Sequence, residues 1–306
     1  MTLSKLTAGP LTIGLELPLD NDWTQDGQRQ RMLYKRPFGV PDLSQHQSLA
    51  RLADELGFRA LWIRDVPLYD PSFGDAAQVF DPLVYLGFLS GITRNILLGT
   101  AAVVLPLRSP WIVRKSAASV QALSQDRLML GVASGDRPSE YPLFGADYEN
   151  RGQAFRNSVE ILTGKQDSRL SPGQAILPDT RTPPLLSAGL SQQSPEWIGQ
   201  HMSGWLAYPG TPEEHVHRVK LWRNVASDKP YVSFIHLDYL DDPKAPRRRH
   251  RFGLQTGREG LLRELEEMQS AGVNHIGLHF RRNQAPVDES LRLIAQDVLG
   301  VFHDAN

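Results

Sequence analysis

The 306-residue sequence has no cysteine and no excess of charge of either sign. The lack of cysteine excludes disulfides, thiolate metal sites and a cysteine nucleophile. With 33 Lys and Arg against 34 Asp and Glu, the net charge is −1, which gives no electrostatic reason to expect nucleic acid or an anionic membrane as a partner. Apolar runs of transmembrane length and a signal-peptide pattern are also lacking. We therefore expect a cytoplasmic protein.

Short β-type runs alternate with amphipathic helical patterns along the whole chain. Each run is followed by a helical pattern, of which the first begins at Pro41 and the second at Asp81. The expected strands are residues 11–17, 60–64, 96–104, 127–133, 185–188, 204–207, 231–237 and 275–279. Eight βα units without a break in composition predict one domain over residues 1–306, a closed (β/α)₈ TIM barrel.

A doubly wound open sheet is the alternative fold. It would normally carry a glycine-rich turn after the first strand, but Pro18, Leu19 and Asp20 stand there, so the dinucleotide fingerprint is missing. Long loops are expected after strands one and seven, at residues 20–40 and 238–256. In a barrel, loops that follow strands lie on the face where active sites form.

Five segments of the chain resemble the luciferase-like monooxygenases. They occur in the order found in that family. The segments are LGTAAVVLPLRSP, LSQDRLMLGVASG, FGADYENRGQAFRNSVEIL, PPLLSAGLSQQSPEWIGQHMSGWLAYP and GLLRELEEMQSAGVNHIGLHF.

The resemblance implies a flavin-dependent oxidoreductase, a monooxygenase that uses reduced FMN and O₂ on a small organic substrate. It further implies a separate flavin reductase as electron source and a homodimer. Two alternatives share the fold: a dehydrogenase that uses the deazaflavin coenzyme, and a flavin-binding protein without catalysis. An unrelated barrel lyase or hydrolase would need a lysine or metal cluster at strand ends, which the sequence does not indicate.

The end of the third expected strand carries the small residues Thr100, Ala101 and Ala102. A flat ring system can lie on a strand end only where no side chain intrudes. The resemblance implies that the flavin ring lies here, beside a cis peptide at the Ala-Ala step. Packing of small residues against neighbouring helices is the structural alternative.

The fourth expected strand ends in Ala133, Ser134 and Gly135. The resemblance places this segment against the same ring, with Ser134 as a hydrogen-bond donor. Some family members have Cys-Arg at the positions of Ala133 and Ser134, so a cationic phosphate ligand is missing here. Arg137 is a candidate replacement, and the alternative is an ordinary surface turn.

The turn after the fifth expected strand contains Gly189, Leu190 and Ser191, followed by Ser194. Gly189 permits close approach of the backbone, and the resemblance assigns the flavin phosphate to the hydroxyls of Ser191 and Ser194. Alternatively, Ser194 is only the N-cap of a helix that begins at Pro195.

A proton-transfer residue is harder to assign. Many family members have a histidine where this chain has Val66. Asp65 remains as a candidate, although pairing with Arg64 or another arginine of the barrel would explain it equally well. Glu16, a charged residue in an apolar strand, needs a partner. It is either structural or part of the substrate pocket.

The run from Arg247 to Arg251 is the main cluster of charge. It follows strand seven, where relatives often have a mobile lid. We expect Arg247, Arg249 and Arg251 to close over the flavin or an anionic substrate, or else to form a solvated loop or an oligomer contact.

The histidines do not indicate a metal site. His215 and His217 point apart on a helix. His275 and His279 share one face of a strand, but no carboxylate accompanies them in the sequence. We therefore expect no metal.

Overall fold

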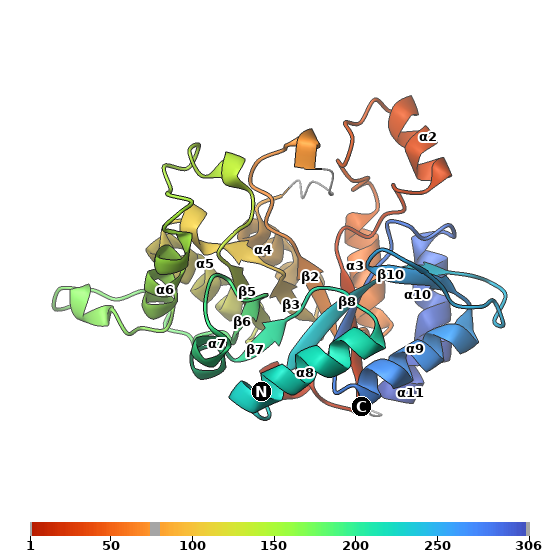
Figure 1. The fold of residues 1–306 in the computed structure, drawn as a ribbon. Coiled ribbons are helices and arrows are strands. Elements are labelled where there is room, and N and C mark those ends of the chain that lie inside the picture. Colours follow the sequence, from red (N-terminus) through yellow and green to blue (C-terminus); the bar gives the residue numbers. More distant parts are fainter. Residues whose placement is uncertain (1, 74–79, 304–306) are drawn as a thin grey trace.

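Eight parallel strands close into a barrel in the computed structural model, which describes residues 2–73 and 80–303 (Figure 1). The last strand, β11, pairs with both β8 and β1, which closes the ring. The predicted (β/α)₈ barrel is therefore confirmed, and the open sheet is excluded. Around the ring the strands are β1 (Thr12–Glu16), β2 (Ala60–Ile63), β3 (Leu97–Thr100), β5 (Leu128–Ala133), β6 (Leu185–Ala188), β7 (Gly204–Leu206), β8 (Tyr231–Tyr239) and β11 (His275–His279).

Helices surround the barrel and begin at the signals that the sequence carries. The carboxylate of Asp81 accepts hydrogen bonds from two backbone N–H groups at the start of α4, and Thr211 and Glu214 form a capping box on α8. The helices are α1 (Thr2–Leu6), α2 (Gln25–Leu33), α3 (His46–Glu55), α4 (Pro82–Ile92), α5 (Pro110–Leu123), α6 (Arg151–Leu162), α7 (Pro195–His201), α8 (Pro212–Ala226), α9 (Arg258–Ser270), α10 (Val287–Ile294) and α11 (Gly300–Phe302). None of the described helices is long and apolar enough to span a membrane.

Two layers of core hold the fold together. The larger layer lies between strands and helices, and the smaller one fills the barrel. Inside the barrel, the rings of Trp62 and Phe234 meet edge to face, with centroids 6.0 Å apart. Leu6 of α1 is fully buried against this inner cluster. The side chain of Thr12 donates a hydrogen bond to the Leu6 carbonyl, so α1 is tied to β1.

The two long loops contain structure that the sequence analysis did not predict. Residues 20–40 include α2, which lies above the barrel on the side away from both termini (Figure 1). Only Gly27 of α2 is buried, so its sequence has no apolar stripe to reveal it. Residues 238–256 include β9 (Arg248–His250) and β10 (Gly253–Thr256). β10 extends the sheet parallel to β8, and β9 pairs with it antiparallel.

Two predicted boundaries were wrong. The strand expected at residues 96–104 is split into β3 and a short β4 (Val103–Val104), with a cis peptide between Ala101 and Ala102. The helix expected from Pro41 begins at His46, because the Asp42 carboxylate accepts from the Ser44 N–H and forms a turn first.

The glycines inside the barrel make room for its aromatic rings, which gives a stability test. A Cβ at Gly277 would lie 2.5 Å from Cδ1 of Phe234. We expect Gly277→Ala to lower the free energy of unfolding by about 1–3 kcal/mol, the cost of overpacking a core. Urea denaturation measures this.

The matched control is Gly91→Ala on α4, an exposed position where no atom lies within 4 Å of the new Cβ. It should be neutral or stabilising, since alanine is the better helix former. Equal stability of both variants would show that the ring of Phe234 can move aside.

Candidate functional site

Three neighbouring strands, β3, β5 and β6, end in small residues at one side of the barrel mouth. They are hydrogen-bonded in this order, so the segments predicted to hold flavin lie next to each other. Ala101 and Ala102 are half-buried, and the bond between them is cis, as the resemblance implied. Thr100 is buried and donates to the Gly131 carbonyl 2.7 Å away, so its hydroxyl is directed at β5.

The end of β5 is shaped by a tyrosine. The hydroxyl of Tyr141 donates to the Ser134 carbonyl. A Cβ at Gly135, whose φ is +81°, would lie 2.6 Å from that hydroxyl, so glycine is required there. Arg137 is buried, with its guanidinium 4.4 Å from the Phe73 ring centroid and 3.9 Å from Glu140. These contacts hold Arg137 in the turn that follows β5.

The turn after β6 has a compact internal hydrogen-bond pattern. Gly189 and Ser191 have positive φ angles of 56° and 47°. The Ser191 hydroxyl donates to the Ala188 carbonyl at 2.9 Å. The Ser194 hydroxyl accepts from the Trp197 N–H at 3.2 Å, which makes Ser194 the N-cap of α7. The side chain of Leu190 is exposed.

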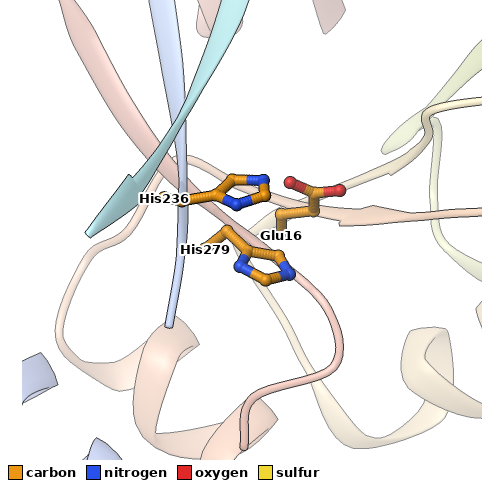
Figure 2. A group of neighbouring side chains, drawn as sticks. All are labelled: Glu16, His236 and His279. Atoms are coloured by element: carbon orange, nitrogen blue, oxygen red, sulfur yellow. The ribbon is translucent and has the colours of Figure 1, made fainter. Parts of the chain in front are cut away.

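On the opposite side of the mouth, three buried polar side chains come together (Figure 2). Glu16 ends β1, His236 lies in β8, and His279 ends β11. The two histidines face each other in register, with ring centroids 4.2 Å apart. One nitrogen of each histidine and one oxygen of Glu16 lie within 4.8 Å of one another. We call Glu16, His236 and His279 the polar triad.

Burial determines the charges in the polar triad. It lowers the pKa of His236 to about 3 and the pKa of His279 well below its ordinary value, with nearby arginines adding to the effect. Both rings are therefore neutral at pH 7. Arg64, at the end of β2, donates from Nε to Oε1 of Glu16 at 2.5 Å. The Nδ1 atoms of both histidines are buried without a hydrogen-bond partner within the described ranges.

The sequence analysis named Glu16 but missed the triad. It compared histidines only along single strands and found no accompanying carboxylate. The carboxylate comes from a neighbouring strand, since β11 lies between β1 and β8. The sequence did carry one signal for the triad, namely the polar residues near the ends of the first, seventh and eighth barrel strands.

Asp65 has a structural position. Its carboxylate accepts from the Val104 N–H at 3.0 Å and from Nε and Nη2 of Arg108 at 3.0 and 2.7 Å. Asp65 thus anchors the segment after β4, and its partner is Arg108, since Arg64 binds Glu16. This geometry favours the structural alternative for Asp65.

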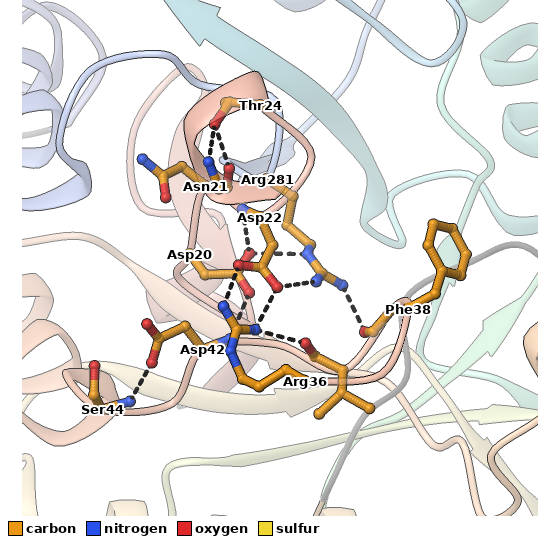
Figure 3. A network of polar contacts seen from close by, with 12 residues as sticks. Asp20, Asn21, Asp22, Thr24, Arg36, Phe38, Asp42, Ser44 and Arg281 are labelled. Carbon is orange, nitrogen blue, oxygen red and sulfur yellow. Dashed lines mark hydrogen bonds and ion pairs between the residues drawn. The ribbon is translucent and has the colours of Figure 1, made fainter. Parts of the chain in front are cut away.

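The loop after β1 is held over the triad by buried ion pairs (Figure 3). Arg281, which follows β11 and is fully buried, reaches Asp20 at 2.8 Å and Asp22 at 3.5 Å. Arg36 binds both oxygens of Asp22, at 2.6 and 2.9 Å. Burial raises the pKa of Asp20 to about 6, against the attraction of Arg281. We call these four residues the loop clasp.

The loop clasp positions an aromatic ring against the histidines. The backbone N–H of Trp23 donates to the Arg281 carbonyl at 2.8 Å. The Trp23 ring centroid lies 5.3 Å from that of His279 and 6.0 Å from that of His236. The loop that the sequence placed on the active-site face therefore contacts the triad directly.

The arginine run makes ion pairs with α9, and at its end Phe252 contacts the ring of His236. Arg247 pairs with Glu264 and Glu267 of α9, at 2.9 and 2.5 Å, and Arg249 pairs with Glu264 at 2.8 Å. Arg251 lies over the Phe252 ring. A lid role stays a prediction, and closure would have to break the ion pairs with Glu264, which is fully buried.

Comparisons with known proteins agree with the resemblance. The model of the luciferase-like monooxygenase family matches residues 21–231. An uncharacterized protein of Mycobacterium tuberculosis is 26% identical over 237 residues, which cover 66% of this chain and 79% of that protein. The name of this relative states no activity.

Solved structures share the fold at low sequence identity. Monooxygenase RslO1 from Streptomyces bottropensis superposes with a TM-score of 0.75 and 19% identity, over 95% of this chain and 99% of that one. An F420-dependent secondary alcohol dehydrogenase, in complex with an F420-acetone adduct, gives a TM-score of 0.71 and 16% identity, over 94% and 98%. The same barrel thus occurs in a monooxygenase and in an F420-dependent dehydrogenase.

The loop clasp predicts a strong dependence of stability on Arg281. Replacing it in Arg281→Met leaves Asp20 and Asp22 buried with less compensating charge. We expect a loss of about 3–5 kcal/mol in the free energy of unfolding, measured by urea denaturation.

The control is Arg282→Met, at an exposed neighbour whose guanidinium lies 5.3 Å from the Trp23 ring centroid. This change should cost within about 0.5 kcal/mol, as surface substitutions do. A small effect in both variants would mean that the clasp contributes little to stability.

Proposed function

The chain belongs to the luciferase-like monooxygenase family, and from this premise we propose that it is a flavin-dependent monooxygenase that binds FMN at the barrel mouth. Its substrates would be O₂ and a small organic molecule. The observation that carries the proposal is the division of the mouth into two unlike sides. Small residues end β3, β5 and β6, whereas the polar triad comes from β1, β8 and β11, across the ring of strands.

The small-residue side fits a flavin. A flat ring needs a strand end without bulky side chains, and Ala101, Ala102 and Ala133 meet this condition. The turn after β6 offers the hydroxyl of Ser191 and the backbone of Gly189 for the phosphate. When bound, the reduced flavin supplies the electrons for activation of O₂.

The triad side would receive the substrate. His236 and His279 are neutral, so each ring offers one N–H donor and one acceptor nitrogen to a substrate, in place of the histidine expected at Val66. Arg64 holds one carboxylate oxygen of Glu16 in place through an ion pair. Trp23, held by the loop clasp, would limit access of water to this side of the mouth.

The cofactor is the part of the proposal that experiment must separate first. The dehydrogenase alternative uses the same barrel with a deazaflavin. A separate reductase would supply reduced FMN, because the chain lacks the glycine-rich fingerprint for a nicotinamide cofactor. Reduced FMN with O₂ and the deazaflavin with an alcohol are therefore the two reactions to compare.

Flavin binding tests the phosphate assignment. FMN titrated into the protein should change the flavin absorption spectrum saturably, with one site per chain. The double variant Ser191→Ala/Ser194→Ala should bind FMN more weakly by about 1–3 kcal/mol, the scale of hydrogen bonds to a charged group. The deazaflavin coenzyme is titrated in parallel.

Ser119→Ala is the control, because this hydroxyl lies on α5 and donates to the Lys115 carbonyl of the same helix. A double variant that binds FMN like the wild type, but melts at a lower temperature, would show that Ser194 is only a helix cap. Saturable binding of the deazaflavin alone would replace FMN as the cofactor.

We also propose a homodimer formed through α4 and α5. These helices expose an apolar surface, with Val84 73% and Ile112 65% accessible and Phe88 and Leu123 also exposed. A shallow cavity lies between the two helices, lined by Leu83, Gly87 and Val113 among others. An exposed apolar face of this kind is typical of an interface between copies.

Light scattering tests the dimer. The wild type should have twice the mass of one chain, and Val84→Glu/Ile112→Glu should have the mass of one chain, because charged residues are disfavoured in the core of an interface. Val216→Glu, at an exposed position of α8, is the control. A wild type of single-chain mass, or a double variant that still dimerises, would refute this interface.

A further inference from the structure

We propose that the polar triad binds a divalent transition-metal ion, such as Zn²⁺ or Fe²⁺, through Glu16, His236 and His279. Two imidazoles and one carboxylate are a donor set that suits these ions and leaves coordination positions open. The proposal concerns the protein without flavin. It therefore stands or falls separately from the proposed function.

The geometry is close to that of a metal site. One donor atom from each residue lies within 4.8 Å of the others. Bonds of about 2.0–2.2 Å to a common ion would bring the donor atoms to roughly 3–3.5 Å from one another. Small rotations of the side chains would achieve this, and the facing pair of His236 and His279 is already fixed by strand register.

The other buried histidines show what a structural histidine looks like in this protein. Nδ1 of His275 lies 2.7 Å from the Thr12 hydroxyl, and its Nε2 accepts from Trp62 at 3.0 Å. His215 is likewise bonded at both nitrogens, by Tyr231 and Ser233. His236 and His279 differ, since Nδ1 of each is buried with no partner among the described residues. This lack of partners sets His236 and His279 apart from the structural histidines, and their other ring nitrogens are directed towards Glu16 (Figure 2).

The charge state of the triad also suits a cation. The unprotonated nitrogen of an imidazole binds a metal ion directly through its lone pair. Arg64 donates from Nε to Oε1 of Glu16 and so fixes the orientation of the carboxylate. Ligating carboxylates are commonly held in this way by a second residue.

The positive groups that face the triad limit the affinity. They are Arg64, Arg281 and Arg282, whose charges all lower the pKa of His279. Arg281 is paired with Asp20 and Asp22, and Arg64 is paired with Glu16 itself, so an ion at the triad would share the Glu16 carboxylate with Arg64. We therefore expect a site that exchanges its metal with the solution, with open positions for an oxygen of a small molecule.

The test uses the full-length protein, dialysed against a chelator and free of flavin. Co²⁺ is titrated into it and followed by its visible absorption bands, which strengthen when the ion enters a site of low coordination number. We expect one Co²⁺ per chain. Glu16→Gln, His236→Ala and His279→Ala should each weaken binding by at least about 10–100-fold, and His217→Ala, at an exposed position of α8, should not.

Zinc X-ray absorption of the wild type adds a readout that does not depend on the folding of the variants. Two imidazole nitrogens per Zn²⁺ would support the site. Absence of stoichiometric Co²⁺ binding to the wild type, or binding that survives in all three triad variants, would overturn the proposal. So would a zinc spectrum without imidazole ligands.

Discussion

The pairing of β11 with β8 on one side and with β1 on the other determines where the polar residues of this protein lie. This double pairing closes the barrel and brings Glu16, His236 and His279 to one side of its mouth. It also carries Arg281 into position to bind Asp20 and Asp22. The small-residue ends of β3, β5 and β6 lie on the other side of the mouth. Closure of the barrel therefore positions both the small-residue side and the polar triad of the proposed site.

Burial of charge has a cost that the rest of the molecule must balance. Arg281 is fully buried and its two acidic partners are nearly so. Such a network is weak evidence for stability, but it fixes the loop that places Trp23 on the histidines. The triad itself has a buried carboxylate and two neutral rings whose Nδ1 atoms have no hydrogen-bond partner in the described part of the chain. These features are more typical of a site that binds a ligand than of a core.

The sequence predicted the barrel well, because each strand is a short apolar run bounded by turn residues. It also predicted the small-residue segments near Ala101, Ser134 and Gly189, since strand ends of neighbouring units must meet. It could not predict α2, which buries almost nothing of its own. It also failed for the triad, because Glu16 and His279 are distant in the chain and become neighbours only through closure of the ring.

Other differences have the same origin in tertiary contacts. The sequence offered Asp65 as a candidate for proton transfer. Its carboxylate instead binds Arg108, which lies 43 residues away in the chain. The arginines at positions 247 and 249 were expected to face a ligand, yet they meet acidic residues of α9. Local patterns gave the positions of these charges along the chain, while the choice of partner depended on packing.

A crystal structure of the protein grown with FMN is the most direct test of the two-sided site. It should show the flavin ring against Ala101 and Ala102, its phosphate at Gly189–Ser191, and the triad across the mouth from the ring. A phosphate bound elsewhere on the molecule, or a ring that lies outside the barrel mouth, would contradict this account.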